Sequence, residues 1–63
     1  MLKNLIINQN LSIKDALKKV EISGQRCVYI EKNNKLIGSL TDGDLRRSLI
    51  EKQDLNLQLK HIC

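Results

Sequence analysis

Residues 12–24 carry the pattern of a short amphipathic helix. Apolar side chains recur at the i, i+3, i+4 and i+7 positions that share one helical face, and mostly charged residues fill the other side. These apolar residues are Ile13, Ala16, Leu17 and Val20. Ser12 and Asp15 have the spacing of a capping box, and Gly24 suits the end of a helix. The pattern predicts a helix between Ser12 and Gly24.

Two runs of β-prone residues follow, at residues 26–31 and 35–41. Their apolar and aromatic members are Cys27, Val28, Tyr29 and Ile30 in the first run and Leu36, Ile37 and Leu40 in the second. Asn33 and Asn34 separate the runs, and asparagine tolerates the positive φ angles that two-residue hairpin turns require. The pattern therefore predicts an antiparallel hairpin.

A second helix is predicted to begin after Thr41, because Thr41 and Asp44 repeat the capping-box spacing. An apolar stripe runs along this helix to about Lys52 and consists of Leu45, Leu49 and Ile50. The polar side carries Arg46, Arg47 and Ser48.

The residues after this helix fit no single element. Their apolar positions alternate at first as in a strand, but they equally fit a turn of helix that packs on something absent. These positions are Leu55, Leu57, Leu59 and Ile62. The whole order is N-terminal segment, helix, strand, strand, helix and tail. It predicts a single α+β domain over residues 1–63, with a small sheet and two helices.

The chain is short for a domain that folds alone. At 63 residues, apolar burial barely offsets the entropy lost in ordering the chain. Cys27 and Cys63 follow no secretory signal, which argues against a disulfide scaffold and favours the cytoplasm. Together with His61 they supply too few ligands for a zinc site. We therefore expect no metal, and we expect a homodimer to supply the missing burial.

Composition excludes several classes of protein. Hydrophobic residues make up 41% and charged residues 29%, as in ordinary globular domains, and no apolar run is long enough to cross a membrane. The net charge of +4 is spread evenly over both halves of the chain. Tyr29 is the single aromatic residue, whereas binders of single-stranded nucleic acid stack bases on several. We expect neither a membrane nor a nucleic-acid partner, and only a general affinity for anions such as phosphate.

The most informative chemistry lies in residues 36–47. No catalytic motif is present, so we expect no catalysis by this chain alone. In this stretch a strand leads through Thr41 into a helix that begins with carboxylates and two arginines. Helix amides, a hydroxyl and an arginine can contact phosphate, while a carboxylate can accept from ribose hydroxyls. The same residues are also explained by a capping box, Thr41 with Asp44, followed by solvated charges, and the spacing alone favours this structural interpretation.

The order of elements, together with the pattern G-x-x-T-x-x-D-L-x-R from Gly38 to Arg47, resembles a CBS domain. This regulatory module is named after cystathionine β-synthase, and the likeness covers nearly the whole chain. Residues 41–47 are similar to CBS domains of bacterial arabinose-5-phosphate isomerases and of sugar-phosphate nucleotidyltransferases. The abundance of Lys, Asn and Ile also favours a bacterial origin.

The resemblance implies a sensor in which two CBS repeats pack around clefts for adenosine-type ligands such as AMP, ADP or ATP. Residue by residue, it implies that Thr41 contacts phosphate and that Asp44 binds the ribose hydroxyls. Gly38 would let the backbone approach the ligand, and Arg47 would be a further phosphate partner. The base would lie near residues 24–28.

The chain departs from the family pattern at two places. Gln25-Arg26-Cys27-Val28 stands where members often carry proline, and His61-Ile62-Cys63 stands where they often carry methionine. The first difference bears on ligand preference, because residues before the first hairpin strand help to shape the base pocket. The tail at residues 55–63 resembles the connector to a second repeat, so we expect a piece of a longer protein.

We therefore expect a nucleotide-sensing module that regulates an attached sugar-nucleotide or sugar-phosphate enzyme. In a homodimer, a second copy would take the place of the tandem repeat. The alternative is a structural module that dimerises and binds no ligand.

Overall fold

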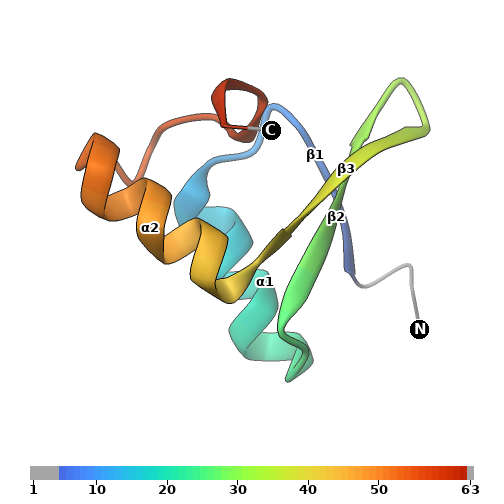
Figure 1. Cartoon of the computed structure of the whole chain (residues 1–63). Helices are drawn as coiled ribbons and strands as arrows, with labels where there is room; N and C mark the ends of the chain where they lie inside the picture. The colour runs from blue at the N-terminus through green and yellow to red at the C-terminus, as the bar shows by residue number, and fades with distance from the viewer. Residues whose placement is uncertain (1–4, 63) are drawn as a thin grey trace.

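The computed structural model describes residues 5–62 (Figure 1). Along the chain lie the strand β1 (Ile6–Asn8), the helix α1 (Ile13–Ser23), the strands β2 (Cys27–Lys32) and β3 (Lys35–Thr41), the helix α2 (Asp42–Lys52) and the short 3-10 helix η2 (Leu59–His61). Both predicted helices and the predicted hairpin are confirmed. The structure adds β1 and η2 in segments to which the sequence assigns no element.

Both helices begin with the predicted capping boxes. In α1 the amide of Asp15 donates to Ser12 Oγ at 3.2 Å, and the amide of Ser12 donates to Asp15 Oδ2 at 3.1 Å. In α2 the amide of Asp44 donates to Thr41 Oγ1, and the amide of Thr41 donates to Asp44 Oδ2, both at 3.0 Å. Each box therefore satisfies two backbone donors that a helix start would leave without partners.

Each helix ends at a left-handed residue, Gly24 with φ 72° and Gln53 with φ 53°. Replacing Gly24 by alanine is expected to lower the free energy of unfolding by about 1 kcal/mol, because a Cβ disfavours this conformation. A Cβ there meets open space, so packing contributes nothing to the change. Gln53→Gly should raise the free energy of unfolding by up to about 1 kcal/mol for the same reason. Urea unfolding measures both variants, and a change of the same sign in the two would contradict the prediction.

The hairpin turns at Asn33 and Asn34, whose φ angles are 52° and 65° as the sequence predicts. Beyond the turn the register shifts, because Glu31 pairs with Leu36 but Ile30 pairs with Gly38. Ile37 is therefore an extra residue on β3, which makes a β-bulge.

The bulge decides which residues of β3 face the core. It brings Leu40 opposite Val28, and both side chains are buried. In a regular two-residue hairpin Leu40 would pair with Cys27 instead and would face the other side of the sheet.

The three strands form one sheet in the order β1-β2-β3, with β1 parallel and β3 antiparallel to β2. Both helices lie to one side of the strands, and the hairpin turn projects away from them (Figure 1). The buried core between the layers consists of Ile7, Ile13, Ala16, Val28, Ile30, Leu40, Leu45 and Leu59.

The predicted stripe of α2 needs one correction. Leu45 is fully buried and Leu49 is packed against the core, but Ile50 is 74% exposed. Leu45 and Leu49 are four residues apart and share a helical face, whereas Ile50 is rotated by about 100° from Leu49.

The tail packs against the domain itself. The amides of Ile13 and Lys14, at the start of α1, donate to the carbonyls of Leu57 and Leu55 at 3.0 and 2.9 Å. Leu59 in η2 has no exposed surface. Of the two structures that the apolar pattern leaves open, the tail forms a helical turn, and it packs on this chain's own core. Cys63 lies outside the described residues.

Candidate functional site

A surface pocket of about 510 Å³ opens at the N-terminus of α2. Arg26, Thr41, Asp42 and Gly43 line it. A second hollow, of about 520 Å³, adjoins it between the end of α1 and α2, and the two share Asp42. Volumes of this order are typical of sites for small molecules.

Pairing of β2 with β3 brings Arg26 to this pocket. Cys27 pairs with Thr41, and the amide of Asp42 donates to the carbonyl of Arg26 at 2.7 Å. The predicted site residues do not include Arg26, because the motif lies entirely on β3 and α2. The predicted two-residue turn would set residue 26 opposite residue 41, but the bulge at Ile37 moves the pairing to Cys27, so the turn alone does not give this position of Arg26.

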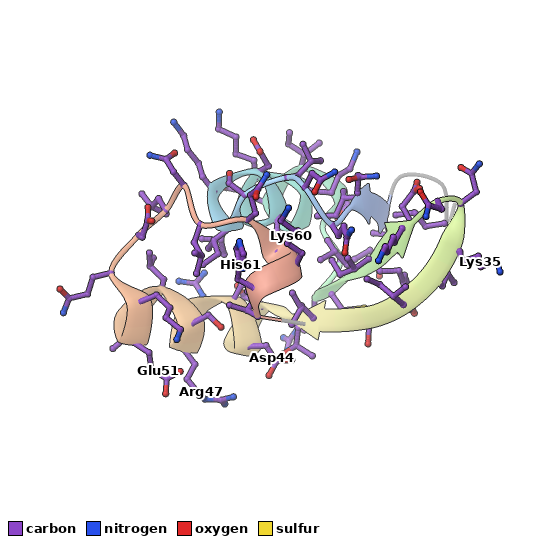
Figure 2. The ribbon with its side chains drawn as sticks, turned by 90° about the horizontal axis from the view of Figure 1, so that it is seen from above. Lys35, Asp44, Arg47, Glu51, Lys60 and His61 are labelled. Atoms are coloured by element: carbon purple, nitrogen blue, oxygen red, sulfur yellow. The ribbon has the colours of Figure 1, made fainter. Side chains whose placement is uncertain are left out.

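Three of the four predicted site residues lie together at this helix end. Thr41 caps α2 and lines the pocket. Asp44 contacts Thr41 through the capping box. Arg47 Nη1 lies 3.3 Å from Asp44 Oδ1, with side chains 70% and 41% exposed. Figure 2 shows Asp44 and Arg47 on the outer side of α2. An ion pair this exposed holds its partners weakly and can open for a ligand.

Gly38 lies apart from the other three. It pairs with Ile30 and lies two residues before Leu40, so Gly38 and Leu40 share one face of β3. Thr41 lies on the opposite face. A Cβ at Gly38 would meet no atom within 4 Å. Among residues 5–62 no side chain fills the space beside its Cα, and its contact with a ligand stays a prediction.

The electrostatics of the pocket favour an anion. The N-terminal end of α2 carries the positive end of the helix dipole, and Arg26 adds a full positive charge. Asp42 accepts from Arg46 Nε at 2.9 Å, so this carboxylate is already paired with a cation. Among residues 5–62, no three His, Cys, Asp or Glu side chains gather as a metal ion would require. Within the same range, no helix is long and apolar enough to cross a membrane.

Acidification is expected to weaken the fold through Asp15 and Asp44. The pKa of each carboxyl lies below its ordinary value of 3.8, mainly because the amide of the cap residue, Ser12 or Thr41, donates to it. A pKa that is lower in the folded state stabilises the fold above the unfolded-state pKa, and this contribution is lost as the pH falls through the folded-state pKa. Urea unfolding at roughly pH 2 to 6 should show this loss, and Asp15→Asn with Asp44→Asn should reduce it. An unchanged pH dependence in the double variant would contradict the assignment.

Comparison with known proteins places this geometry in a family. The family model described as CBS domain matches residues 1–51. Two uncharacterized proteins of Helicobacter pylori, from strains J99 and 26695, are 39% and 36% identical over 61 residues. The alignments cover 92% of this chain and 18% of each relative, so the chain spans less than a fifth of their length.

A solved structure gives the same result for the fold. The crystal structure of the CBS domain NE2398 superposes with a TM-score of 0.81 and 25% identity, over 92% of this chain and 46% of that one. The fold, with its two helices and three-stranded sheet, agrees with the sequence match. The chain therefore belongs to the CBS domain family.

Proposed function

We propose that this CBS domain is a regulatory module that binds an adenosine-type nucleotide, such as AMP, ADP or ATP, at the N-terminus of α2. CBS domains generally serve regulatory or ligand-binding roles, and a lone CBS domain is typically not catalytic. The observation that carries the proposal is the pocket lined by Arg26, Thr41, Asp42 and Gly43, where the positive end of a helix meets a cation.

Thr41 suits a phosphate even though it is also the helix cap. Its Oγ1 accepts from the amide of Asp44, and its hydroxyl also donates to the Asp44 carboxylate, so it can turn to a phosphate oxygen when a ribose hydroxyl takes that carboxylate. Arg26 lines the same pocket and can add a charge-assisted hydrogen bond. The cap and the phosphate contact are therefore compatible in one side chain.

Asp44 suits the ribose. Its Oδ2 accepts from the amide of Thr41, while its Oδ1 contacts the exposed guanidinium of Arg47 at 3.3 Å. When a ribose hydroxyl donates to Asp44, Arg47 can turn from the carboxylate to a phosphate oxygen. Binding would thus replace one exposed ion pair by two charge-assisted contacts with the ligand.

Regulation would work by linkage to an attached enzyme. A nucleotide that prefers one arrangement of paired CBS domains shifts that equilibrium by its differential affinity. We propose a cytoplasmic bacterial protein in which residues 55–63 lead toward a second repeat, or a homodimer that replaces it. The regulated part would be a sugar-phosphate isomerase or nucleotidyltransferase. The longer relatives leave room for such a part, because the match covers 18% of their length.

A ¹⁵N–¹H NMR titration of the full chain with AMP, ADP, ATP and CMP tests the proposal. We expect saturable shifts for the adenine nucleotides at the amides of Arg26, Thr41, Gly43 and Asp44, while the hairpin-turn amides serve as internal controls. Inorganic phosphate is the matched ligand control. Equal shifts with phosphate and with all four nucleotides would reduce the pocket to a general anion site, and no shift with any of them would reject it.

The second candidate function is a structural dimerisation module without a ligand. The observation in its favour is exposed apolar surface on β3, where Leu36 is 61% and Ile37 is 45% exposed. A second copy that covers this surface would bury it. The nucleotide titration distinguishes the candidates, because both modules can dimerise but the structural module would give no shifts with any nucleotide.

A further inference from the structure

The hollow between the end of α1 and α2 has the lining of a site in its own right. Its volume is about 520 Å³, and Asp42 lines both this hollow and the pocket at the N-terminus of α2. Leu17 and Val20 form an apolar floor, because both are partly buried against the core. Glu21 and Gln25 add polar groups beside this floor. An apolar floor with a few polar groups is typical of a site that holds a small molecule.

The hollow lies on the opposite side of α2 from Asp44. Successive residues of a helix are rotated by about 100°, so Arg46 lies about 40° from Asp42, whereas Asp44 lies about 200° from it. Arg46 lines the hollow, while Asp44 and Arg47 lie on the outer side of the helix (Figure 2). With the ribose at Asp44 and the phosphate at Thr41, as proposed above, the hollow faces whatever the phosphate carries on its far side.

The charges around the hollow select a neutral polar group. Asp42 and Glu21 each contribute a carboxylate, and among the described residues Glu21 forms no salt bridge. Arg46 contributes a cation, whose Nε lies 2.9 Å from Asp42 Oδ1, with side chains 68% and 38% exposed. This exposed arginine can bridge Asp42 and a second phosphate. A third phosphate would meet the apolar floor and the carboxylate of Glu21, whereas hydroxyl groups can donate to Glu21 and bond with Gln25.

We propose that the hollow binds the sugar of a nucleoside diphosphate sugar. This inference rests on the proposed function, which supplies the place of the ribose and of the first phosphate. The second phosphate pairs with Arg46 at the passage between the two hollows. The sugar ring lies on Leu17 and Val20, and its hydroxyls donate to Glu21. The nucleotide sugar, and not the free nucleotide, is then the ligand that the module senses.

Isothermal titration calorimetry of the full chain with ADP, ATP and ADP-glucose tests the proposal. ATP carries more negative charge than ADP, and ADP-glucose carries less, so a general anion site would bind ATP most tightly and ADP-glucose least. We expect ADP-glucose to bind about fivefold or more tightly than ADP, and ATP to gain nothing over ADP. In NMR titrations, ADP-glucose should shift the amides of residues 17–25 in addition to those that ADP shifts.

Glu21→Ala isolates the sugar contact. It should remove most of the advantage of ADP-glucose and should leave the affinity for ADP little changed. Glu51→Ala is the matched control, because it removes a carboxylate of α2 that lines neither hollow. The control should bind both ligands as the unchanged chain does.

The outcomes separate this inference from the proposed function. Equal affinity for ADP and ADP-glucose, or an advantage of ADP-glucose that survives Glu21→Ala, would reject the sugar site and leave the nucleotide pocket in place. Absence of binding by all three ligands would reject the proposed function, and this inference with it.

Discussion

Leu59→Ala is expected to lower the free energy of unfolding by about 2–5 kcal/mol, because it removes a fully buried side chain and leaves a cavity. Small domains are stabilised by only about 0.05–0.15 kcal/mol per residue, so this loss would unfold a large share of the molecules. Leu59 lies in the tail, yet it packs among the core residues of both helices and the sheet. Urea unfolding followed by circular dichroism measures the effect.

Leu55→Ala is the matched control for this prediction. Leu55 lies in the same tail, but its side chain is 43% exposed, and the substitution keeps the carbonyl that accepts from Lys14. We expect a loss below about 1 kcal/mol. If both variants lost the same small amount, the tail would be a loose connector and not part of the core.

Asp44→Ala is expected to weaken adenine-nucleotide binding by about 1–3 kcal/mol, which is roughly 5- to 150-fold in the dissociation constant. The physical reason is the loss of a charged acceptor for the ribose hydroxyls. Isothermal titration calorimetry of the full chain with the nucleotide that gives the largest NMR shifts measures this change. The variant also loses half of the capping box of α2, so its stability must be recorded alongside.

Asp15→Ala separates these two effects. Asp15 occupies the same N3 position in the capping box of α1, and its pKa is lowered by the same kind of contact. Both variants should lose a similar amount of stability, whereas only Asp44→Ala should lose affinity. Equal losses of affinity would show that binding follows the stability of the domain and not a ribose contact of Asp44.

Much of the fold follows from local interactions that the sequence states directly. The capping boxes at Ser12 and Thr41 join residues three apart, and the turn at Asn33 and Asn34 depends on two residues that tolerate positive φ. The family resemblance that named Thr41, Asp44 and Arg47 as site residues also rests on a local motif, because the three lie within two turns of one helix.

The parts that the sequence did not predict depend on contacts between distant residues. β1 is only three residues long and exists because it pairs with β2. The place of Leu59 in the core depends on helices and strands that the tail meets only after folding. Neither segment has enough local preference to show its structure in isolation.

The sequence by itself determined both helices with their caps, the hairpin turn, and the motif at the start of α2, since each depends on residues within a few positions of one another. Only the tertiary structure decided the bulge at Ile37, which turns Leu40 inward, and the arrival of Arg26 beside Thr41. A shift of one residue in register exchanges the two faces of a strand, and burial of the whole core selects between the two registers.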